Sequence, residues 1–374
     1  MTSAPAVSGI IGKIPVRNIW LLMLYASRLY RELPSRQRYR AEENPDDLPD
    51  LIAEILTGAV ERRIRRNLTH DFQRSEADLT RVRGRIDALR TERRSLLQKG
   101  RVACSFDELT TDTPQNRLVK AALNKLRASV KEQGLARRCR RLAAALDQAS
   151  VGDEPSAGIR SRSLRNTLAA RRANTEDRQM LAAAELALKL SLPTEDPGSA
   201  HLVAPDRDEV WARRLFEAAV GGFYSTVLGP RGWSVNAGQR IKWPIGDKTS
   251  RIDAIMPQMQ TDIVLQCPPD EHGRRSRTVI DTKFTSILKS GKHRELTLKS
   301  GHIYQMYAYL RSQESDHDPR SLDSSGLLLH PCVSEEVDEY AVIQGHRIHF
   351  ATVDLTAEST DIRARLINLA NRFA

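Results

Sequence analysis

The chain reads RIDAIMPQMQTDIVL at residues 251–265 and, after a polar loop, TVIDTKF at residues 278–284. The loop contains two prolines, an aspartate and a glycine, a composition typical of turns. Two short apolar runs joined in this way predict an antiparallel pair of strands. Asp262 is then expected at the start of one strand, while Asp281 and Lys283, two positions apart, leave the same face of the other. Two carboxylates and an ammonium group are therefore expected in one small volume.

These three side chains have a chemical use. Asp262 and Asp281 are expected to hold Mg²⁺, a hard cation that prefers carboxylate oxygens and keeps several waters. Such an ion polarises a phosphodiester and activates a water as the nucleophile. Lys283 is expected to orient or help deprotonate that water and to offset charge on the phosphate. Because Asp-x-Lys also arises by chance, the alternative is a surface hairpin with solvated charges.

Two predicted helices flank this strand pair. Residues 211–224 (WARRLFEAAVGGFY) predict an amphipathic helix, and residues 302–310 (HIYQMYAYL) predict a helix packed on the sheet. The order of a helix with Glu, a strand with Asp, a strand with Asp-x-Lys and a helix with Gln resembles that of PD-(D/E)XK nucleases. The resemblance implies one catalytic set made up of Glu217, Asp262, Asp281, Lys283 and Gln305. For His293 and His302, which lie nearby in sequence, an ordinary surface role is favoured over contact with phosphate.

The composition favours a nucleic-acid partner. The 374 residues carry a formal charge of +11 and a sequence pI of about 9.7, which favours an anionic partner such as nucleic acid. Aromatic residues make up only 5%, which weakens a scheme based on stacking of single-stranded bases. No phosphate-binding loop of the G-x-x-x-x-G-K-[ST] type is present, so binding of a nucleoside triphosphate by a P-loop is not expected.

The cysteines and the hydropathy pattern favour a cytoplasmic protein. Four scattered cysteines without a Cys-x-x-Cys pair predict reduced thiols and no zinc site. No apolar run approaches the roughly 20 residues that span a membrane, so no membrane association is expected. The N-terminus also lacks the layout of a signal peptide.

The length favours two domains. Residues 1–195 are predicted to be a mainly helical domain with a small β element, and residues 198–374 an α/β domain with a mixed sheet. The boundary is the breaker-rich stretch PTEDPGS at 193–199. In the first domain Asn18 is the expected N-cap of a buried helix. Further helices are expected at 48–68, 114–126, 135–149 and 164–192, and strands at 78–87 and 101–109.

Several motifs along the whole chain resemble the McrC family, the nuclease subunits of McrBC modification-dependent restriction systems. They are IPVRNIW (14–20), GRID (84–87), SFDEL (105–109), NRLVK (116–120), MQTDI (259–263), IDTKF (280–284) and YQM (304–306). The resemblance implies a Mg²⁺-dependent type IV restriction endonuclease subunit that works with McrB, a hexameric AAA+ GTPase. GTP would be bound by that partner, whose specificity domain recognises methylated cytosine. The N-terminal half would engage and stimulate the GTPase, and the C-terminal half would cut double-stranded DNA.

Three arginines are candidates for partner contact, because exposed arginines suit interface anchoring. They are Arg17, Arg83 and Arg85. The alternative is that they brace the N-terminal core through surface ion pairs, each contributing about 0–1 kcal/mol. The long loop at 266–278 departs from the family pattern, and methylcytosine specificity is implied by analogy alone.

Two other functions remain open at this stage. A free-standing RecB-like DNA repair nuclease would account for the C-terminal motifs, although it has no need of the N-terminal ones. A non-cutting subunit that only activates the GTPase would account for the N-terminal motifs, although it has no need of Asp262, Asp281 and Lys283.

Overall fold

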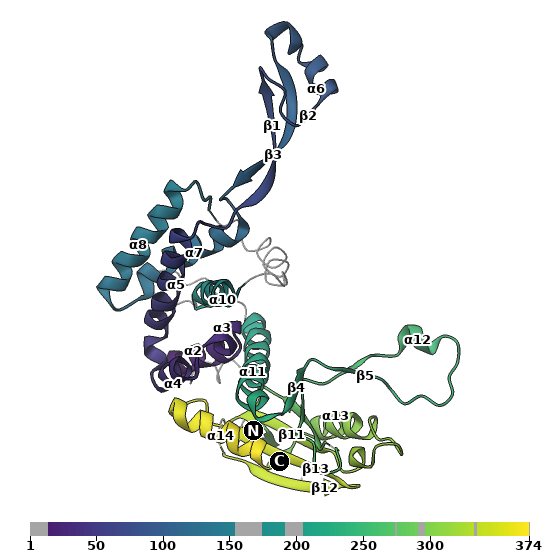
Figure 1. Ribbon diagram of the computed structural model, residues 1–374. Helices are drawn as coiled ribbons and strands as arrows, with labels where there is room; N and C mark the ends of the chain where they lie inside the picture. Colours follow the sequence, from purple (N-terminus) through teal and green to yellow (C-terminus); the bar gives the residue numbers. More distant parts are fainter. Residues whose placement is uncertain are drawn as a thin grey trace. The chain divides into compact units, whose positions relative to one another are not determined.

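The computed structural model describes residues 14–153, 174–190, 205–273, 275–290, 296–332 and 335–373 (Figure 1). It consists of two compact units. The sheet unit comprises Met1–Leu48 and Pro193–Ala374, and the helical unit comprises Pro49–Leu192. The predicted change of unit near residue 193 agrees with this division, although the stretch 193–199 itself lies outside the described residues. Residues 14–48 correct the predicted domains, because they belong to the same compact unit as the C-terminal part of the chain.

The sheet unit is built on six strands in the order β12-β13-β11-β8-β7-β4 (Figure 1). Their bounds are β4 Ser234–Ala237, β7 Ile263–Gln266, β8 Arg277–Thr282, β11 Ser325–Pro331, β12 Asp338–Ile343 and β13 His346–Val353. β11 runs parallel to β8 and β13, while the other neighbouring pairs are antiparallel. The predicted mixed sheet of an α/β domain is therefore confirmed. Two smaller ladders pair β5 (Arg240–Ile241) with β6 (Met259–Gln260) and β9 (Leu288–Ser290) with β10 (Leu296–Leu298).

Helices cover both faces of this sheet. The bounds are α11 Pro205–Leu228, α13 Ser300–Arg311 and α14 Ser359–Asn371. Alternate strand residues such as Val264 and Val279 share an apolar cluster with Met306 of α13. Ile263, which points the other way, lies close to Gly221 of α11. Asp281 and Lys283 continue the alternation of Val279, so they belong to the face that α13 covers.

The predicted strand pair at 251–265 and 278–284 is only partly correct. β7 and β8 pair antiparallel as expected. Residues Ile252–Ile255, however, form the helical turn α12. This segment belongs to the loop that connects β5 with β6. Because β5 and β6 pair with each other, the segment has no neighbouring strand with which to form backbone hydrogen bonds.

The N-terminal segment forms α2 (Val16–Tyr25), α3 (Arg28–Glu32) and α4 (Ser35–Glu43), all in the sheet unit. The prediction that Asn18 caps the first helix is wrong, because α2 already begins after Pro15. Asn18 is buried, and its Nδ2 donates to the carbonyl oxygens of Leu355 at 2.8 Å and Ala357 at 2.9 Å. The amide thus ties α2 to the chain that leads into α14, a contact over more than 300 residues.

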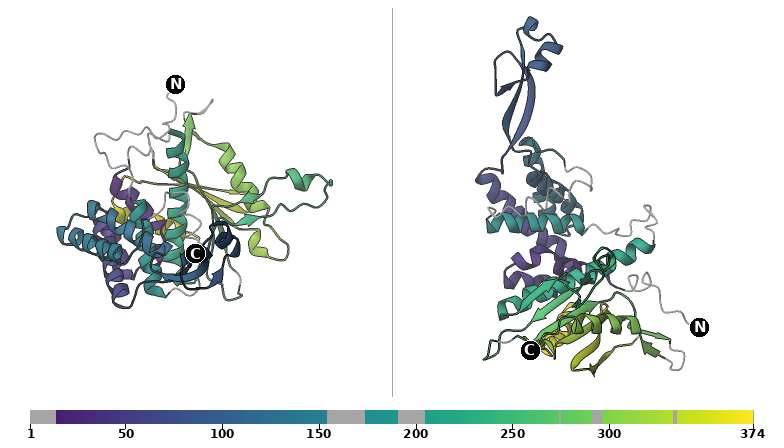
Figure 2. Two further views of the ribbon diagram at one scale, coloured as in Figure 1. Left: turned by 90° about the horizontal axis from the view of Figure 1, so that it is seen from above. Right: turned by 90° about the vertical axis from the view of Figure 1, so that its right-hand side faces the viewer.

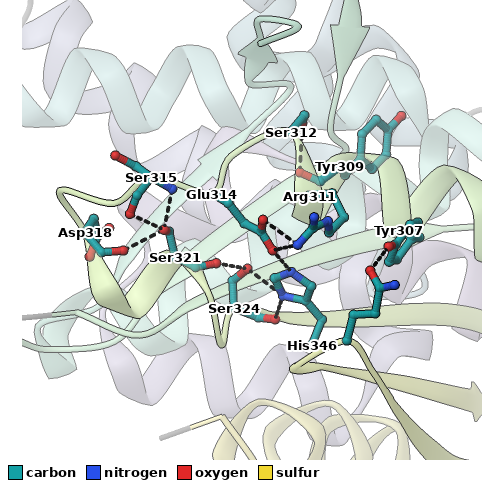
Figure 3. Close-up of polar contacts among 11 residues, drawn as sticks. Tyr307, Tyr309, Arg311, Ser312, Glu314, Ser315, Asp318, Ser321, Ser324 and His346 are labelled. Atoms are coloured by element: carbon teal, nitrogen blue, oxygen red, sulfur yellow. Dashed lines mark hydrogen bonds and ion pairs between the residues drawn. The ribbon is translucent and has the colours of Figure 1, made fainter.

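The end of α13 is held on the sheet by a buried polar network (Figure 3). His346 of β13 is fully buried, and its Nε2 lies 2.7 Å from Oε1 of Glu314, just beyond α13. Its Nδ1 lies 2.9 Å from the carbonyl oxygen of Ser324. Arg311 at the end of α13 also donates to Glu314, at 2.6 Å. Because buried polar groups are costly when left unpaired, this network fixes the position of the helix that carries Gln305.

The helical unit contains α5, α7, α8 and α10 and a three-stranded sheet in the order β1-β3-β2. The bounds of these helices and strands, and of the short helix α6, are α5 Leu48–Arg65, β1 Asp71–Leu79, β2 Arg85–Ile86, α6 Ala88–Arg93, β3 Val102–Thr110, α7 Pro114–Ser129, α8 Gln133–Gln148 and α10 Thr175–Lys189. The side chain of Thr113 caps α7, which begins at a proline as predicted. The predicted strand at 78–87 divides into β1 and β2, because Gly84 takes a left-handed φ of +68° between them. Of the helix expected at 164–192, residues 164–173, 191 and 192 lie outside the described residues.

Residues 71–110, which we call the finger, extend away from α7 and α8 of the same unit (Figures 1 and 2). Large apolar side chains are exposed on it, including Phe72 at 72% and Leu89 at 76%. Leu97 and Leu109 are exposed as well. Several large apolar side chains exposed on one element of this kind are typical of an interaction surface. Among the described helices none is long and apolar enough to cross a membrane.

Candidate active site

The structure brings the two predicted aspartates and the lysine together. β7 and β8 pair Ile263 with Ile280, so Asp262 and Asp281 are neighbours across the same end of the strand pair. Asp281 is fully buried in β8. Lys283 directly follows β8, and its Nζ lies 2.9 Å from Oδ1 and 2.8 Å from Oδ2 of Asp281. The same-face placement expected from the spacing is therefore confirmed.

Asp262 is oriented by a residue that the sequence analysis did not single out. Its Oδ2 accepts hydrogen bonds from the backbone N–H of Thr282 at 2.7 Å and from the Thr282 hydroxyl at 2.9 Å. Both bonds go to one oxygen, which leaves Oδ1 of Asp262 available to another partner. The only sequence signal for this role is the place of Thr282 between Asp281 and Lys283.

Glu217 and Gln305 approach the cluster from two helices. Glu217 of α11 is half-buried; burial raises the pKa of its carboxyl, and the negative charge of Asp262 raises it further. Gln305 of α13 donates to the Tyr309 hydroxyl at 2.6 Å. That hydroxyl donates to the carbonyl oxygen of Gln260, two residues before Asp262, at 2.8 Å. All five residues predicted for the catalytic set therefore lie in one region of the sheet unit.

The two aspartates outnumber the ammonium group at the strand ends. Burial raises the pKa of Asp281 to about 6, Lys283 opposes this shift, and Asp262 and Glu217 add to it. Glu217 is also within electrostatic reach of Arg213 and Arg214, which lower its pKa as Lys283 does. A divalent cation would offset the negative charge of the two aspartates.

The donor atoms fit a magnesium ion held mainly by two carboxylates and water. Oδ2 of Asp281 is buried and makes no hydrogen bond in the described part of the chain, because its contact with Lys283 has poor hydrogen-bond geometry. Among the described residues no three His, Cys, Asp or Glu side chains enclose a metal position. Mg²⁺ keeps several waters and needs few protein ligands, so two carboxylates are sufficient to hold it.

A cleft of about 320 Å³ opens beside Lys283. Its lining residues are Val210, Arg213, Lys283, Phe284, Thr285, His302 and Gln305. The ring of His302 packs against that of the buried His330, with ring centroids 5.5 Å apart. Burial lowers the pKa of His302 to about 4, and the positive charge of Lys283 lowers it further, so its imidazole is neutral near pH 7. The sequence analysis favoured a surface role for His302, whereas it faces the site; His293 lies outside the described residues.

The fold and the site define an α/β protein with a carboxylate–lysine cluster at the ends of two neighbouring strands. The chain belongs to the family of McrBC 5-methylcytosine restriction system components, whose sequence profile matches residues 10–322. The resemblance seen in the sequence motifs is thereby confirmed.

Proteins similar to this chain include a restriction enzyme and a solved restriction complex. A relative from Escherichia coli (strain K12), described as type IV methyl-directed restriction enzyme EcoKMcrBC, is 23% identical over 367 residues. The match covers 96% of this chain and 98% of that protein. A solved half-complex of Thermococcus gammatolerans McrB AAA+ hexamers with bound McrC is 13% identical, with a TM-score of 0.42. That match covers 95% of this chain and 76% of the other.

The raised pKa of Asp281 predicts a pH-dependent effect of the Asp281→Asn substitution on stability. The folded protein keeps this proton up to about pH 6, whereas an aspartate in an unfolded chain releases it near about pH 3.9. The folded state therefore binds more protons between these values and loses stability as the pH rises through them. Without Mg²⁺, the variant should be more stable than the parent at pH 8 by about 2–3 kcal/mol.

This difference should shrink as the pH falls from 8 toward 5. The measurement is denaturant unfolding of both proteins in EDTA across this range, with Asp323→Asn, at an exposed aspartate, as the matched control. A stability difference that stays constant with pH would contradict the prediction.

Proposed function

We propose that this chain is the nuclease subunit of a GTP-dependent restriction complex and hydrolyses phosphodiester bonds of double-stranded DNA with Mg²⁺. The observation that carries the proposal is the convergence of Asp262, Asp281 and Lys283 at adjacent strand ends, in a chain of a restriction-system family. The formal charge of +11 supports an anionic substrate. Methylated DNA as the target is part of the proposal, in keeping with the family description.

Each residue of the site has its own role in the proposed reaction. Asp262, oriented by Thr282, and the buried Asp281 would hold Mg²⁺, which supplies Lewis acidity at the phosphodiester when bound. Lys283 is placed to orient the attacking water and to donate to a phosphate oxygen. Gln305 lines the same cleft and presents an amide to the substrate. Glu217, with its raised pKa, is a proton acceptor within reach of the cluster.

We further propose that the finger binds a hexameric AAA+ GTPase of the McrB type and stimulates GTP hydrolysis. Its exposed apolar side chains and the exposed Arg85 support this. Arg83 stacks over the ring of Phe106, with its guanidinium carbon 4.1 Å from the centroid, and pairs with Glu108 at 3.4 Å. Arg17 lies in the sheet unit and pairs with Glu358 at 2.7 Å. The bracing role considered for these arginines therefore suits Arg17 and Arg83, and partner contact suits Arg85 best.

The test is a reconstitution of the full chain with an AAA+ GTPase of the McrB type. Cleavage of methylated plasmid DNA with GTP and Mg²⁺, and loss of cleavage in EDTA, is the expected result. Cleavage that needs neither partner nor GTP would instead support a free-standing repair nuclease. Stimulation of GTP hydrolysis without cleavage under any condition would support a non-cutting activator.

The finger arginines give a separate prediction. Arg85→Ala is expected to lower stimulation of the partner GTPase by about tenfold or more, because truncation of an interface arginine often costs about 2 kcal/mol. Phosphate release with increasing amounts of the full chain measures this. Arg137→Ala, at an exposed arginine of α8 outside the finger, is the matched control. An equal loss in both variants would show that general positive charge, and not the finger, supports stimulation.

A further inference from the structure

A second cleft, of about 460 Å³, adjoins the carboxylate cluster. It is formed by α11, the edge strand β4 and the N-terminal helix α3. Lining residues that matter here are Arg31, Arg214, Glu217, Gly221, Val235 and Gly238. Glu217 belongs to this lining and is also electrostatically coupled to Asp262 and Lys283. A charged residue of the second cleft therefore interacts electrostatically with the residues of the candidate active site.

Two consecutive arginines on α11 line different clefts. Arg213 lines the first cleft, beside Lys283, and Arg214 lines the second. Glu217 lies one helical turn after the two arginines. Successive helical residues point about 100° apart, so Arg213 and Arg214 extend to opposite sides of Glu217. Positive side chains therefore line both clefts, Lys283 and Arg213 in the first and Arg214 and Arg31 in the second.

In the part of the chain that the structure describes, these arginines form no ion pair with a carboxylate, although the charges of Arg213 and Arg214 lower the pKa of Glu217. Several arginines of the sheet unit are engaged by carboxylates, in the pairs Arg17–Glu358, Arg320–Asp270, Arg363–Glu42 and Arg365–Asp338. In the described part of the chain, no carboxylate lies within ion-pair distance of Arg31, Arg213 or Arg214. Exposed guanidinium groups that line a cleft and are not held in an ion pair suit an anionic ligand, and their planar fork matches the oxygens of a phosphodiester.

We propose that the second cleft binds the backbone of the DNA strand that flanks the scissile phosphate, with Arg31 and Arg214 each contacting a phosphate. The proposal rests on the proposed nuclease function and adds a binding surface to it. The cleaved strand would run from the first cleft, past Glu217, into the second. Gly221 and Gly238 in the lining present backbone without a side chain, so a strand can approach closely there.

The proposal gives the N-terminal segment a role in DNA binding. Arg31 lies on α3, and the preceding helix α2 is seated directly on α11. A Cβ on Gly222 of α11 would lie 2.1 Å from the carbonyl oxygen of Tyr25, so the two backbones are in close contact. The N-terminal helices therefore complete the DNA cleft, whereas the family resemblance had assigned this segment to partner binding.

The test measures binding of the full chain to a fluorescently labelled DNA duplex at several salt concentrations, without Mg²⁺. Arg31→Ala and Arg214→Ala are each expected to weaken binding about tenfold, as for loss of a charge-assisted hydrogen bond. Each should also make the slope of log K against log salt less steep by roughly 0.9, the value for one phosphate contact. Arg31→Lys should keep most of the slope, because it keeps the charge.

Arg36→Ala is the matched control, since Arg36 is an exposed arginine of the nearby helix α4 that lines neither cleft. If Arg31→Ala and Arg214→Ala lose no more affinity or slope than Arg36→Ala, the proposed cleft is overturned, even if the wild-type complex cuts DNA. If they lose both while the wild-type complex cuts no DNA, the cleft stands and the nuclease function fails. The two proposals can therefore fail separately.

Discussion

Asp281→Asn is expected to lower the rate of DNA cleavage by about 10²–10³-fold, as for loss of one preorganised electrostatic contact. Asp281 is fully buried between two strands, in contact with Lys283 and beside Asp262. The amide keeps the shape of the side chain but cannot supply the negative charge that a divalent cation requires. The same substitution is expected to stabilise the metal-free protein at pH 8. Lost activity together with gained stability would separate a chemical role from a folding defect.

The measurement is single-turnover cleavage with partner, GTP and Mg²⁺, compared with the exposed Asp323→Asn control. Asp262→Asn extends the test, because its side-chain oxygen can still accept from Thr282 while its charge is removed. It should lose activity to a similar degree. Cleavage at the wild-type rate by Asp281→Asn would rule out this cluster as the active site.

Gly222→Ala is expected to destabilise the sheet unit by about 3 kcal/mol, at the upper end for overpacking. The added Cβ would lie 2.1 Å from the carbonyl oxygen of Tyr25 and 3.1 Å from its carbonyl carbon. These are backbone atoms of another helix, so no side chain can rotate to make room. Relief requires α2 to move away from α11, which would also disturb the rings of Tyr25 and Phe223, packed 4.9 Å apart.

The neighbouring Gly221→Ala is the control for this change. Its added Cβ would meet side-chain carbons at 3.6 Å, an ordinary contact, and alanine favours the helix by roughly 1 kcal/mol. Denaturant unfolding of the two full-length variants should therefore shift in opposite directions. Equal unfolding midpoints would show that α2 is not seated on α11. If it is seated there, Gly222→Ala should also weaken DNA binding through Arg31.

Local signals in the sequence determined most of the secondary structure. The helix predicted over residues 211–224 lies within α11 (Pro205–Leu228), and the helix predicted at 135–149 agrees with α8 (Gln133–Gln148) to within two residues at each end, since their apolar pattern is strong. The placement of Asp281 and Lys283 on one face followed from the period of two residues in a strand alone. Membership of the family was also evident in motifs spread along the chain.

Other features depend on contacts between residues far apart in the sequence. Asn18 had the composition of a helix cap, yet its amide bonds carbonyl groups near residue 355. Ile252–Ile255 had the composition of a strand, yet no neighbouring strand is available to it. Turn and cap preferences amount to about 1 kcal/mol, so burial and long-range hydrogen bonds override them.

For the site as well, some features followed from the sequence and others from contacts between distant residues. The sequence determined the acidic and basic side chains that do chemistry, because their types and spacing reflect what a divalent cation and a phosphodiester require. Only the tertiary structure decided that Thr282 orients Asp262, that His302 faces the cleft, and that Arg31 lies beside Glu217. Helix α3 reaches the site because α2 packs on α11, about 200 residues away in sequence, through the absent side chain of Gly222. No local pattern encodes that contact, since its physical basis is close approach between two backbones.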